Sequence, residues 1–527
     1  MKHIKFLSLL MALSFIFCLA GCEKGGNESQ ISTLQTDEEE VKMRDYLTLL
    51  YSATDSFNPY TLKTDVNRQL VKLLYEPLVK LNNEFEPINA LAQQVSVNGN
   101  TCTVELKKAK MSDGSFLTAE DVVYSFNLAK ASSTSYGAQL YGITSAKAQG
   151  DSVVFSLSNQ DPYCANVLNF PIIKKDSDTK TDSDSVKLPP VGCGRFKLND
   201  TLDGLVLNDG YYGTIKNIKE IRLINAPDTE SVEHYTEIGA ADIYFTEISD
   251  GNITRMSGSR QDVNLNNLVY IGINRNNAAL KENNVRQALS LAVDRTKLCK
   301  DAYYNNALPA TGFFHPAWKE AGSVQNLQIE AKMQITIENL EEIGYNKLDN
   351  DGIRKNSSGS SLKFTMLVNK ENRIKVLAAN TIAKQLKNAG IGITVVEKPY
   401  SEYIADLQNG NFQLYLGEIR LSDNMDISPL FVSGGAAAYG LPKAEERDNS
   451  ETEEESEPQV TSSEAVLKEF YSGGATIKDV ASVLQTEMAA VPLCYRTGVL
   501  FYNSNIKNVN NSSANDIYFS IEAYLIN

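Results

Sequence analysis

The chain has 527 residues, which is enough for two or three domains, and its formal net charge at pH 7 is −15. An acidic surface repels the phosphates of nucleic acids, so we expect no nucleic-acid partner. The chain has three histidines and no CxxC pair, and this disfavours a zinc site or a histidine-based catalytic triad.

The N-terminus has the pattern of a secretion signal. Two lysines precede an apolar run at 6–20, which is too short for a permanent membrane helix. The run ends in Leu-Ala-Gly-Cys at 19–22, and this tetrapeptide resembles the bacterial lipobox. The resemblance implies removal of residues 1–21, a lipid on Cys22 and residence on the outer face of the bacterial cytoplasmic membrane. The alternatives are an ordinary signal peptide and a buried helix, and in both Cys22 is incidental.

Residues 22–42 are rich in Gly, Ser, Thr, Asn and acidic side chains, so we expect a flexible tether. Beyond Cys22, the mature part of the chain has five cysteines. Their number is odd and their spacing is wide, so no disulfide framework is visible and at least one thiol should be free. We expect all five to be buried small residues, namely Cys102, Cys164, Cys193, Cys299 and Cys494.

In the first half of the chain, short alternating segments predict strands at 47–53, 101–106 and 153–157. A helix is expected at 67–74. Thr118 and Asp121 have the spacing of a capping box, which predicts that a helix begins after Thr118.

The second half continues the alternation of strands and helices. Strands are expected at 270–274 and 391–395, and helices at 285–293 and 371–389, the last of them ending at Gly390. This order predicts α/β domains. Residues 443–463 interrupt the order with a run of glutamates, for which we expect a disordered surface loop. Cation binding by this segment is the alternative.

Several segments, in this order, resemble the oligopeptide/dipeptide/nickel class of extracellular solute-binding proteins, which serve ABC importers. Two departures stand out, since Cys193 and Arg195 replace the Thr and Pro of a Gly-Thr-Gly-Pro pattern. The matching segments are colinear and lie at 75–78, 112–114, 117–125, 191–196, 272–274, 285–289, 293–295, 389–391 and around Pro492.

The resemblance implies an α/β, bilobal type II periplasmic-binding-protein fold with an extra subdomain in the first lobe. A ligand would be enclosed between two lobes that are joined by two crossing segments, and closure around the ligand would follow from contacts with both lobes. The expected boundaries are 43–266 plus 499–527 for the first lobe, 82–188 for its subdomain, 274–490 for the second lobe, and 265–274 and 491–499 for the crossings.

The resemblance also suggests site residues. In peptide-binding relatives an Asp of the second lobe pairs with the ligand's ammonium group. Here Asp426 is the first candidate and Asp423 the second, because the register is ambiguous. Arg420 could receive a carboxylate, or could form a salt bridge with Glu418 or Asp426. The remaining candidates are Asp65, Val66 and Asn67 in a loop expected to touch peptide backbone, Phe57, Phe313 and Phe314 as pocket walls, and Arg496 beside a crossing.

The function that these features imply is capture of a short peptide for delivery to an ABC permease by a monomeric, lipid-anchored protein. No cofactor, metal or catalytic residue is expected. The alternatives are a nickel or metal-chelate binder, a binder of another small solute, and a peptide-sensing co-receptor. An enzyme is disfavoured because no Gly-x-Ser-x-Gly elbow or phosphate loop is present, although carboxylate or Ser/Lys chemistry stays open.

Overall fold

The computed structural model describes residues 44–248, 256–327, 332–442 and 462–527. The expected signal, the tether with Cys22 and nearly all of the acidic segment at 443–463 lie outside these ranges. Within the described part of the chain, no helix combines the length and the apolar composition needed to cross a membrane.

The first lobe is built on a four-stranded sheet in the order β1-β10-β9-β8. Its strands are β1 (Tyr46–Tyr51), β8 (Phe196–Leu198), β9 (Gly204–Leu207) and β10 (Glu220–Asn225). Strand β1 pairs in parallel with β10, while the other two pairings are antiparallel. Helices α2 (Asp65–Leu74) and α5 (Thr229–Glu237) belong to the same lobe, and α2 packs against β1 and β8.

A second, antiparallel sheet lies in the expected subdomain, in the order β4-β5-β7-β6. Helix α3 (Ala119–Ala131) packs against β6 and β7, and its capping box is present: the Thr118 side chain accepts from the Asp121 amide while the Asp121 carboxylate accepts from the Thr118 amide. The elements here are β3 (Pro87–Asn89), β4 (Ala92–Asn98), β5 (Thr101–Leu106), α4 (Ser135–Gln139), β6 (Ile143–Gln149), β7 (Ser152–Leu157) and the 3₁₀ turns Cys164–Val167 and Ser177–Thr179. Strand β2 (Val79–Leu81) lies just before the expected subdomain and pairs with β3.

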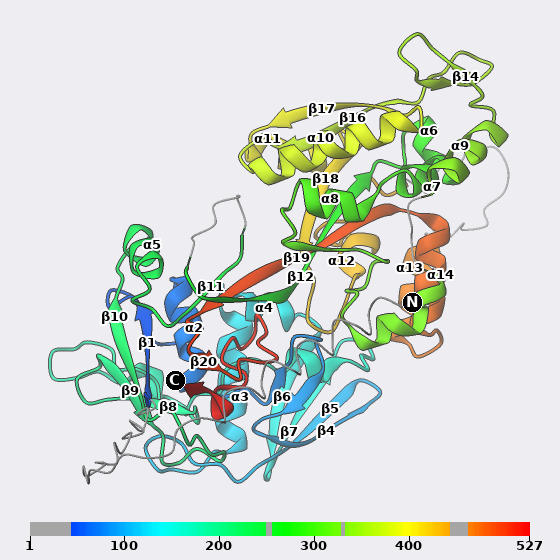
Figure 1. The fold of residues 1–527 in the computed structure, drawn as a ribbon. Helices are drawn as coiled ribbons and strands as arrows, with labels where there is room; N and C mark the ends of the chain where they lie inside the picture. The colour runs from blue at the N-terminus through cyan, green and yellow to red at the C-terminus, as the bar shows by residue number, and fades with distance from the viewer. Residues whose placement is uncertain (1–43, 249–255, 328–331, 443–461) are drawn as a thin grey trace, which may run out of the picture. The chain divides into compact units, whose positions relative to one another are not determined.

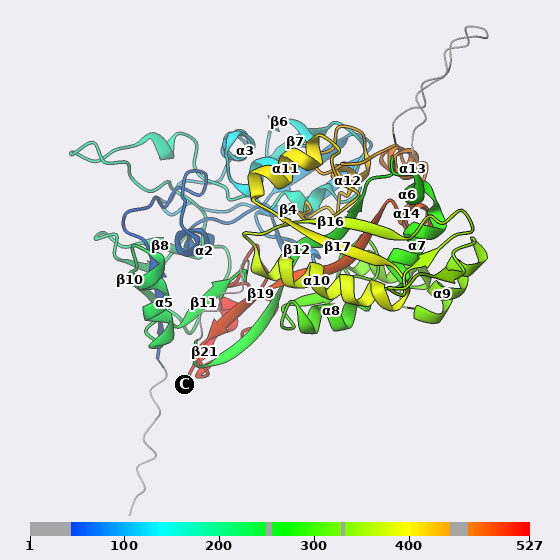
Figure 2. The same cartoon turned by 90° about the horizontal axis from the view of Figure 1, so that it is seen from above.

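A seven-stranded sheet extends from the first lobe into the second. Its order is β11-β19-β12-β18-β16-β17, and β13 pairs with β19 off this path. Figures 1 and 2 show the two longest strands, β12 and β19, running side by side. The strands are β11 (Ile243–Thr246), β12 (Ser259–Ile273), β13 (Ala307–Pro309), β16 (Lys363–Asn369), β17 (Gly392–Lys398), β18 (Leu414–Arg420) and β19 (Ala490–Tyr502).

The pairing of β12 with β19 shifts its register at two places, between Asn264 and Leu268 and between Val269 and Tyr270. Asn264 pairs with Thr497 and Leu268 with Tyr495, so residues 265–267 of β12 face the single residue Arg496. A bulge of this kind bends a strand and increases its local twist. Both segments expected as crossings lie inside or directly beside these two strands.

Helices of the second lobe pack on this large sheet. Figure 2 shows α10 and α11 over the strands β16 and β17. The helices are α6 (Ala278–Lys281), α7 (Asn283–Leu291), α8 (Arg295–Asp301), α9 (Met333–Glu342), α10 (Arg373–Asn388), α11 (Tyr400–Gln408), α12 (Ser428–Phe431), α13 (Ser462–Tyr471) and α14 (Ile477–Glu487). Shorter elements are the 3₁₀ segments Lys319–Leu327 and Ile521–Ala523 and the strands β14 (Lys347–Leu348), β15 (Arg354–Lys355), β20 (Ile506–Lys507) and β21 (Leu525–Ile526).

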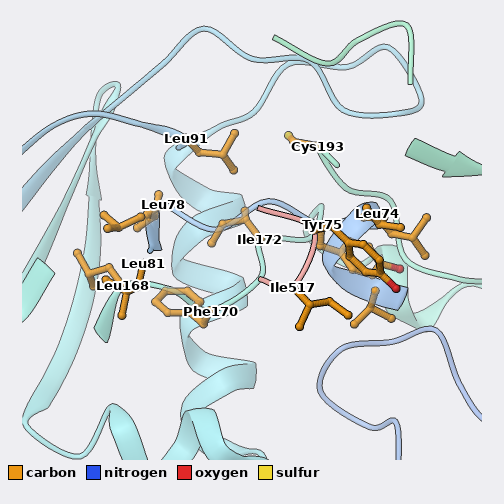
Figure 3. Close-up of a cluster of buried hydrophobic side chains, with 14 of the residues drawn as sticks. Leu74, Tyr75, Leu78, Leu81, Leu91, Leu168, Phe170, Ile172, Cys193 and Ile517 are labelled. Atoms are coloured by element: carbon orange, nitrogen blue, oxygen red, sulfur yellow. The ribbon is translucent and has the colours of Figure 1, made fainter. Parts of the chain in front are cut away.

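The first-lobe core joins segments that are far apart in sequence. Figure 3 shows Leu74 and Tyr75 at the end of α2 close to Ile517 of the C-terminal segment, with Leu78, Phe170 and Ile172 beyond them. Each fully buried side chain of this size contributes roughly 1.5–3 kcal/mol by leaving water. The C-terminal segment is thereby part of the first lobe.

A buried ion network ties the same segment to the core. The Arg195 guanidinium, 1 % exposed, lies 2.7 Å from the Asp516 carboxylate and 3.3 Å from the Glu76 carboxylate. A buried charge is tolerated only when it is paired in this way. Arg195, a departure from the family pattern, thus has a structural role.

Candidate ligand-binding cavity

A polar cavity of about 800 Å³ lies where the first lobe meets the end of β18. Its walls are the start of α2, residues 133–136 at the start of α4, the segment before α5, strand β11 and part of the C-terminal segment. Among the lining residues, Arg420 alone comes from the second lobe. A cavity of this size is within the range of small-molecule sites.

The start of α2 is held in place by one carboxylate. Asp55 accepts hydrogen bonds from the backbone amides of Lys63 (2.9 Å) and Thr64 (2.7 Å) and from the Thr64 hydroxyl (2.7 Å). Partial burial raises the pKa of Asp55, but these bonds outweigh it and the pKa is lowered overall. The carboxylate therefore stays ionised and fixes the loop that lines the cavity.

Two of the three residues expected to touch a ligand in this loop line the cavity. Asp65 and Val66 are wall residues, and the first amides of a helix have no acceptor inside the helix. Asn67 is fully buried and holds the preceding segment in place. Its side chain accepts from the Ser52 amide (2.8 Å) and donates to the Ser52 carbonyl (3.0 Å).

The cavity contains more positive than negative side chains. The cations are Lys63, Arg68, Lys72 and Arg420, and the carboxylates are Asp65, Asp228 and Glu247. Three of these groups are already engaged within the first lobe. Arg68 forms a salt bridge with Asp65, and Asp228 caps α5 through the Ser231 amide at 2.8 Å.

Lys72 has an unusual environment for a lysine. Its ammonium group donates to Gln69 Oε1 (2.8 Å) and to the Ala514 carbonyl (2.5 Å), both of which are neutral acceptors. Burial lowers the pKa of Lys72 to about 7. Its charge is therefore sensitive to pH near neutrality, and an anion in the cavity would stabilise the charged form.

Arg420 reaches across to the first lobe. Its guanidinium lies 3.2 Å from the carboxylate of Glu247, which follows β11. Both side chains are more than a third exposed, so this pair contributes little to stability in water. The expected pairing of Arg420 with Glu418 or Asp426 is not the one found here.

Asp423 also bridges the two lobes. Its carboxylate accepts from the side-chain amides of Asn169 (2.7 Å) and Asn515 (3.1 Å), and its backbone carbonyl accepts from Asn166 (3.2 Å). All three donors belong to the first lobe. Burial raises the pKa of Asp423, and the nearby Arg420 and the amide donors counteract part of this rise.

Asp426 is engaged within the second lobe. Its carboxylate accepts from the Tyr471 hydroxyl (2.6 Å) and from the Ser428 amide (2.8 Å). It is 4 % exposed and is not among the residues that line the cavity. In this conformation its contacts are those of a residue that orders the loop before α12.

Arg496 lies at the bulge between β12 and β19 and contacts both lobes. It donates to Glu418 Oε1 (2.8 Å) in the second lobe and to the Ile248 carbonyl in the first. Burial raises the pKa of Glu418, but Lys375 at 3.1 Å and Arg496 lower it to about 2 overall. Arg496 is thus part of an ion cluster at the crossing.

The three candidate phenylalanines pack against other rings. Phe57 stacks on Tyr51 with ring centroids 6.1 Å apart. Phe313 meets Phe431 edge-to-face at 4.9 Å, and Phe314 packs on Trp318 at 5.6 Å. None of the three is a lining residue of the cavity, although Phe314 borders a small gap near Trp318.

Sequence reasoning missed several lining residues. Lys72 lies two helical turns after the predicted Asp65, so the helical period places it on the same face of α2. No comparable signal identifies Glu247 or Asn515, because long-range packing brings them to the cavity. The five cysteines beyond Cys22 are all buried, as predicted.

The described residues give no support for a metal centre of protein ligands. No group of three or more His, Cys, Asp or Glu side chains among them is placed to hold an ion. His315 accepts from the Ala317 amide through Nδ1 (3.1 Å), and burial lowers its pKa to about 3. It is therefore neutral near pH 7.

Two lobes that share a curled sheet, with a polar cavity where the first lobe meets the end of β18, define the class of type II periplasmic-binding proteins, as predicted. Residues 84–437 match the family described as "Bacterial extracellular solute-binding proteins, family 5 Middle". The chain belongs to this family.

Individual relatives agree with this assignment. The oligopeptide-binding protein AppA of Bacillus subtilis (strain 168) is 24% identical over 433 residues, covering 77% of this chain and 78% of AppA. The structure of AppA with a nonapeptide covers 92% of this chain and 100% of AppA at 20% identity, with a TM-score of 0.56. NikA from Brucella suis with Fe(III)-EDTA covers 91% of this chain and 100% of NikA at 19% identity, with a TM-score of 0.67.

Proposed function

We propose that this protein is the substrate-binding lipoprotein of an ABC importer and that it captures short peptides in the cavity between its lobes. The observation that carries the proposal is the polar cavity of about 800 Å³, walled by the first lobe and bordered by Arg420 of the second. A ligand that touches both walls favours the closed form, because only that form makes both sets of contacts.

The first-lobe wall suits the main chain and an anionic end of a peptide. The amides at Asp65 and Val66 and the positive end of the α2 dipole can face carbonyl or carboxylate oxygens. Lys63 and Lys72 add positive charge to a protein whose net charge is −15. The wall therefore offers donors and cations where a peptide has acceptors.

For the ammonium end we favour Asp423 over Asp426. The Asp423 carboxylate already receives amide donors from the first lobe, whereas Asp426 is engaged by Tyr471 and Ser428 within its own lobe. An ammonium group could compete for Asp423 with the amides of Asn169 and Asn515. The ionised form of a buried carboxylate is stabilised most by a partner of opposite charge.

The location follows from the sequence pattern at 19–22. Lipidation of Cys22 would hold the protein at the outer face of the cytoplasmic membrane, as a monomer beside the permease that receives its ligand. Several acyl chains would make this anchoring stable.

A metal chelate is the second candidate ligand. The cations of the cavity suit an anionic chelate, which needs few direct protein ligands to its metal. NikA from Brucella suis binds Fe(III)-EDTA in its structure and shares this fold. Another small solute, or a role as a peptide-sensing co-receptor, would use the same cavity.

The experiment is mass spectrometry of ligand released from protein purified from its native host, followed by calorimetry with the ligand found. We expect short peptides, and micromolar or tighter binding by the refolded, ligand-free protein. A chelate or a non-peptide solute in their place would overturn peptide capture. Failure of folded, ligand-free protein to bind any peptide in a length-graded library would do the same.

A further inference from the structure

Residues 82–188, the expected subdomain, contact the second lobe at a place apart from the cavity. Two segments of the subdomain, 82–86 and 160–169, each place an aromatic ring against rings of the second lobe. The two residues are Phe85 and Tyr163, and neither of them lines the cavity. They therefore join the lobes without meeting a ligand that the cavity holds.

Tyr163 lies between two aromatic rings of the second lobe. Its ring meets Trp318 edge-to-face, with ring centroids 4.9 Å apart, and lies nearly parallel to Phe470 of α13 at 6.4 Å. Trp318 is 4 % exposed and also packs on Phe314. Edge-to-face and offset-stacked pairs are the favoured arrangements of aromatic rings and stabilise beyond the area that they bury. Tyr163 thus occupies a slot of which both walls belong to the second lobe.

The backbone of Tyr163 is held by a carboxylate that also reaches the second lobe. Asp161 Oδ1 accepts from the Tyr163 amide (2.9 Å), and Asp161 Oδ2 accepts from the side-chain amide of Asn424 (2.8 Å). Asn424 belongs to the loop after β18, next to Asp423. One side chain therefore fixes the segment that presents the tyrosine ring and binds the loop that faces it.

Phe85 makes the other aromatic contact from a strained backbone position. Its φ is 60°, which is rare for a bulky residue, and the turn is held by hydrogen bonds from Phe85 N to the Asn82 carbonyl (3.1 Å) and from Asn166 to the Phe85 carbonyl (2.9 Å). The Phe85 ring, 5 % exposed, packs on His315 at 4.7 Å, and His315 packs on Tyr495 of β19 at 4.5 Å. Strain of this kind persists where surrounding contacts impose it. The turn is thus built to place this ring against the second lobe.

The same turn is anchored to the strand that crosses between the lobes. Asn83 Oδ1 accepts from the Asn264 amide (2.8 Å), and the Asn83 carbonyl accepts from the Asn264 side chain (2.6 Å). Asn264 is the last residue of β12 that pairs with β19 before the bulge. The turn is therefore fixed on the first-lobe side of the bulge, so that opening there would draw Phe85 away from His315.

We propose that the subdomain acts as a clasp, in which Phe85 and Tyr163 are positioning residues that favour the closed form and thereby raise the affinity for ligand. The inference rests on the proposed function, in which closure encloses the ligand. Separation of the lobes would return the rings of Phe85, Tyr163 and Trp318 to water, which disfavours the open form. Apparent affinity is reduced by the fraction of molecules that are not closed, so loss of the clasp weakens the binding of different ligands by the same factor.

The clasp contains its own reporter, because Trp318 is the only tryptophan of the chain. The test uses the mature chain carrying Cys22→Ser, freed of ligand by unfolding and refolding, and measures quenching of tryptophan fluorescence by acrylamide. Phe85→Ala leaves the ring neighbours of Trp318 in place, yet it should raise the quenching constant because the lobes separate. Tyr163→Ala should raise it as well. Tyr163→Phe, which keeps the ring, and Tyr141→Ala, which removes a tyrosine of the same subdomain that is 52 % exposed, should leave it unchanged.

Affinity gives the second readout. Calorimetry with two peptides of different sequence, taken from a length-graded library, should show a Kd that is higher in Tyr163→Ala by roughly three- to tenfold, with the same factor for both peptides. Phe470→Ala removes the same contact from the second lobe and should give a similar factor, so the test stands even if Tyr163→Ala does not fold. A residue that touched the ligand would change the two affinities unequally.

The outcomes separate the clasp from peptide capture. Raised quenching in Phe85→Ala, in a protein that binds no peptide, would support the clasp and overturn the proposed function. Unchanged quenching in Phe85→Ala, together with an unchanged Kd in Tyr163→Ala and Phe470→Ala, would overturn the clasp and leave peptide capture intact. Factors that differ between the two peptides would also overturn the clasp, since they would indicate direct contact with the ligand.

Discussion

The two walls of the cavity are built differently. The first lobe contributes helix starts, Lys63 and Lys72, and backbone amides that can still donate a hydrogen bond to a ligand. From the second lobe Arg420 lines the cavity, whereas Asp423 and Asp426 in the loop that follows are not lining residues and are already hydrogen-bonded. Under the proposed function, this difference predicts that the first lobe supplies most of the ligand contacts and that the second lobe, through Asp423, couples the ammonium end of the ligand to closure.

The largest expected loss of ligand affinity is that of Asp423→Ala. The change removes the acceptor of two first-lobe amides and leaves Asn169 and Asn515 unpaired in the closed form. We expect a loss of about 2–3 kcal/mol in ligand binding, or roughly 30- to 150-fold in Kd, measured by calorimetry.

Asp426→Ala is the matched control for this loss. Its partners, Tyr471 and Ser428, lie in the same lobe, so the melting temperature should fall while the Kd changes by less than about threefold. Equal losses of affinity in the two variants would contradict the assignment of Asp423 to the contact between lobes.

Lys72→Met tests recognition by the first lobe. For a ligand with a free carboxylate we expect a loss of about 1–1.5 kcal/mol near pH 6, or roughly five- to tenfold in Kd. Because burial lowers the pKa of Lys72 to about 7, its ammonium group loses its proton as the pH rises through neutrality. Affinity of the unaltered protein should therefore fall between pH 6 and pH 9.

This pH dependence should disappear in Lys72→Met and should be weak for the C-terminally amidated form of the same peptide. Calorimetry at several pH values, in buffers of different ionisation enthalpy, would measure it. An unchanged pH profile in Lys72→Met would show that another group is responsible.

The smallest effect is expected for Arg420→Ala. Its salt bridge with Glu247 is exposed and screened by salt, so removal should cost about 0.2–1 kcal/mol, or less than roughly sixfold in Kd. A much larger loss that persists at high salt would mean that Arg420 binds the ligand directly. Glu247→Gln, which removes the same bridge but keeps Arg420, distinguishes the two cases.

Much of the fold could be predicted because local pattern and tertiary structure agree. The alternation at 101–106 became β5, the capping box at Thr118 begins α3, and Gly390 follows α10 with a φ of 80°. In each case the signal comes from neighbours within a few residues. The bilobal class was likewise predicted, from motifs that lie in the same order along the chain.

The cavity was predicted only in part. Asp65, Val66 and Arg420 line it, but Glu247 and Asn515 are brought there by packing over hundreds of residues, for which one sequence carries no signal. The aromatic candidates illustrate the converse problem. Phe313 and Phe314 have the composition of a pocket wall, yet burial against Phe431 and Trp318 is the commoner use of such rings.

The bulge opposite Arg496 has a mechanical consequence. Strands β12 and β19 pair up to Asn264 and again from Leu268, with a second register shift after Val269, so changes of backbone dihedral angle can be absorbed at these two places. We expect the two lobes to pivot at these two places while the other pairs between β12 and β19 stay intact. The free-energy barrier to opening and closing would then come from a few backbone dihedral angles and from the ion cluster around Glu418. Such a barrier is small, which suits a motion that is repeated for every ligand molecule captured.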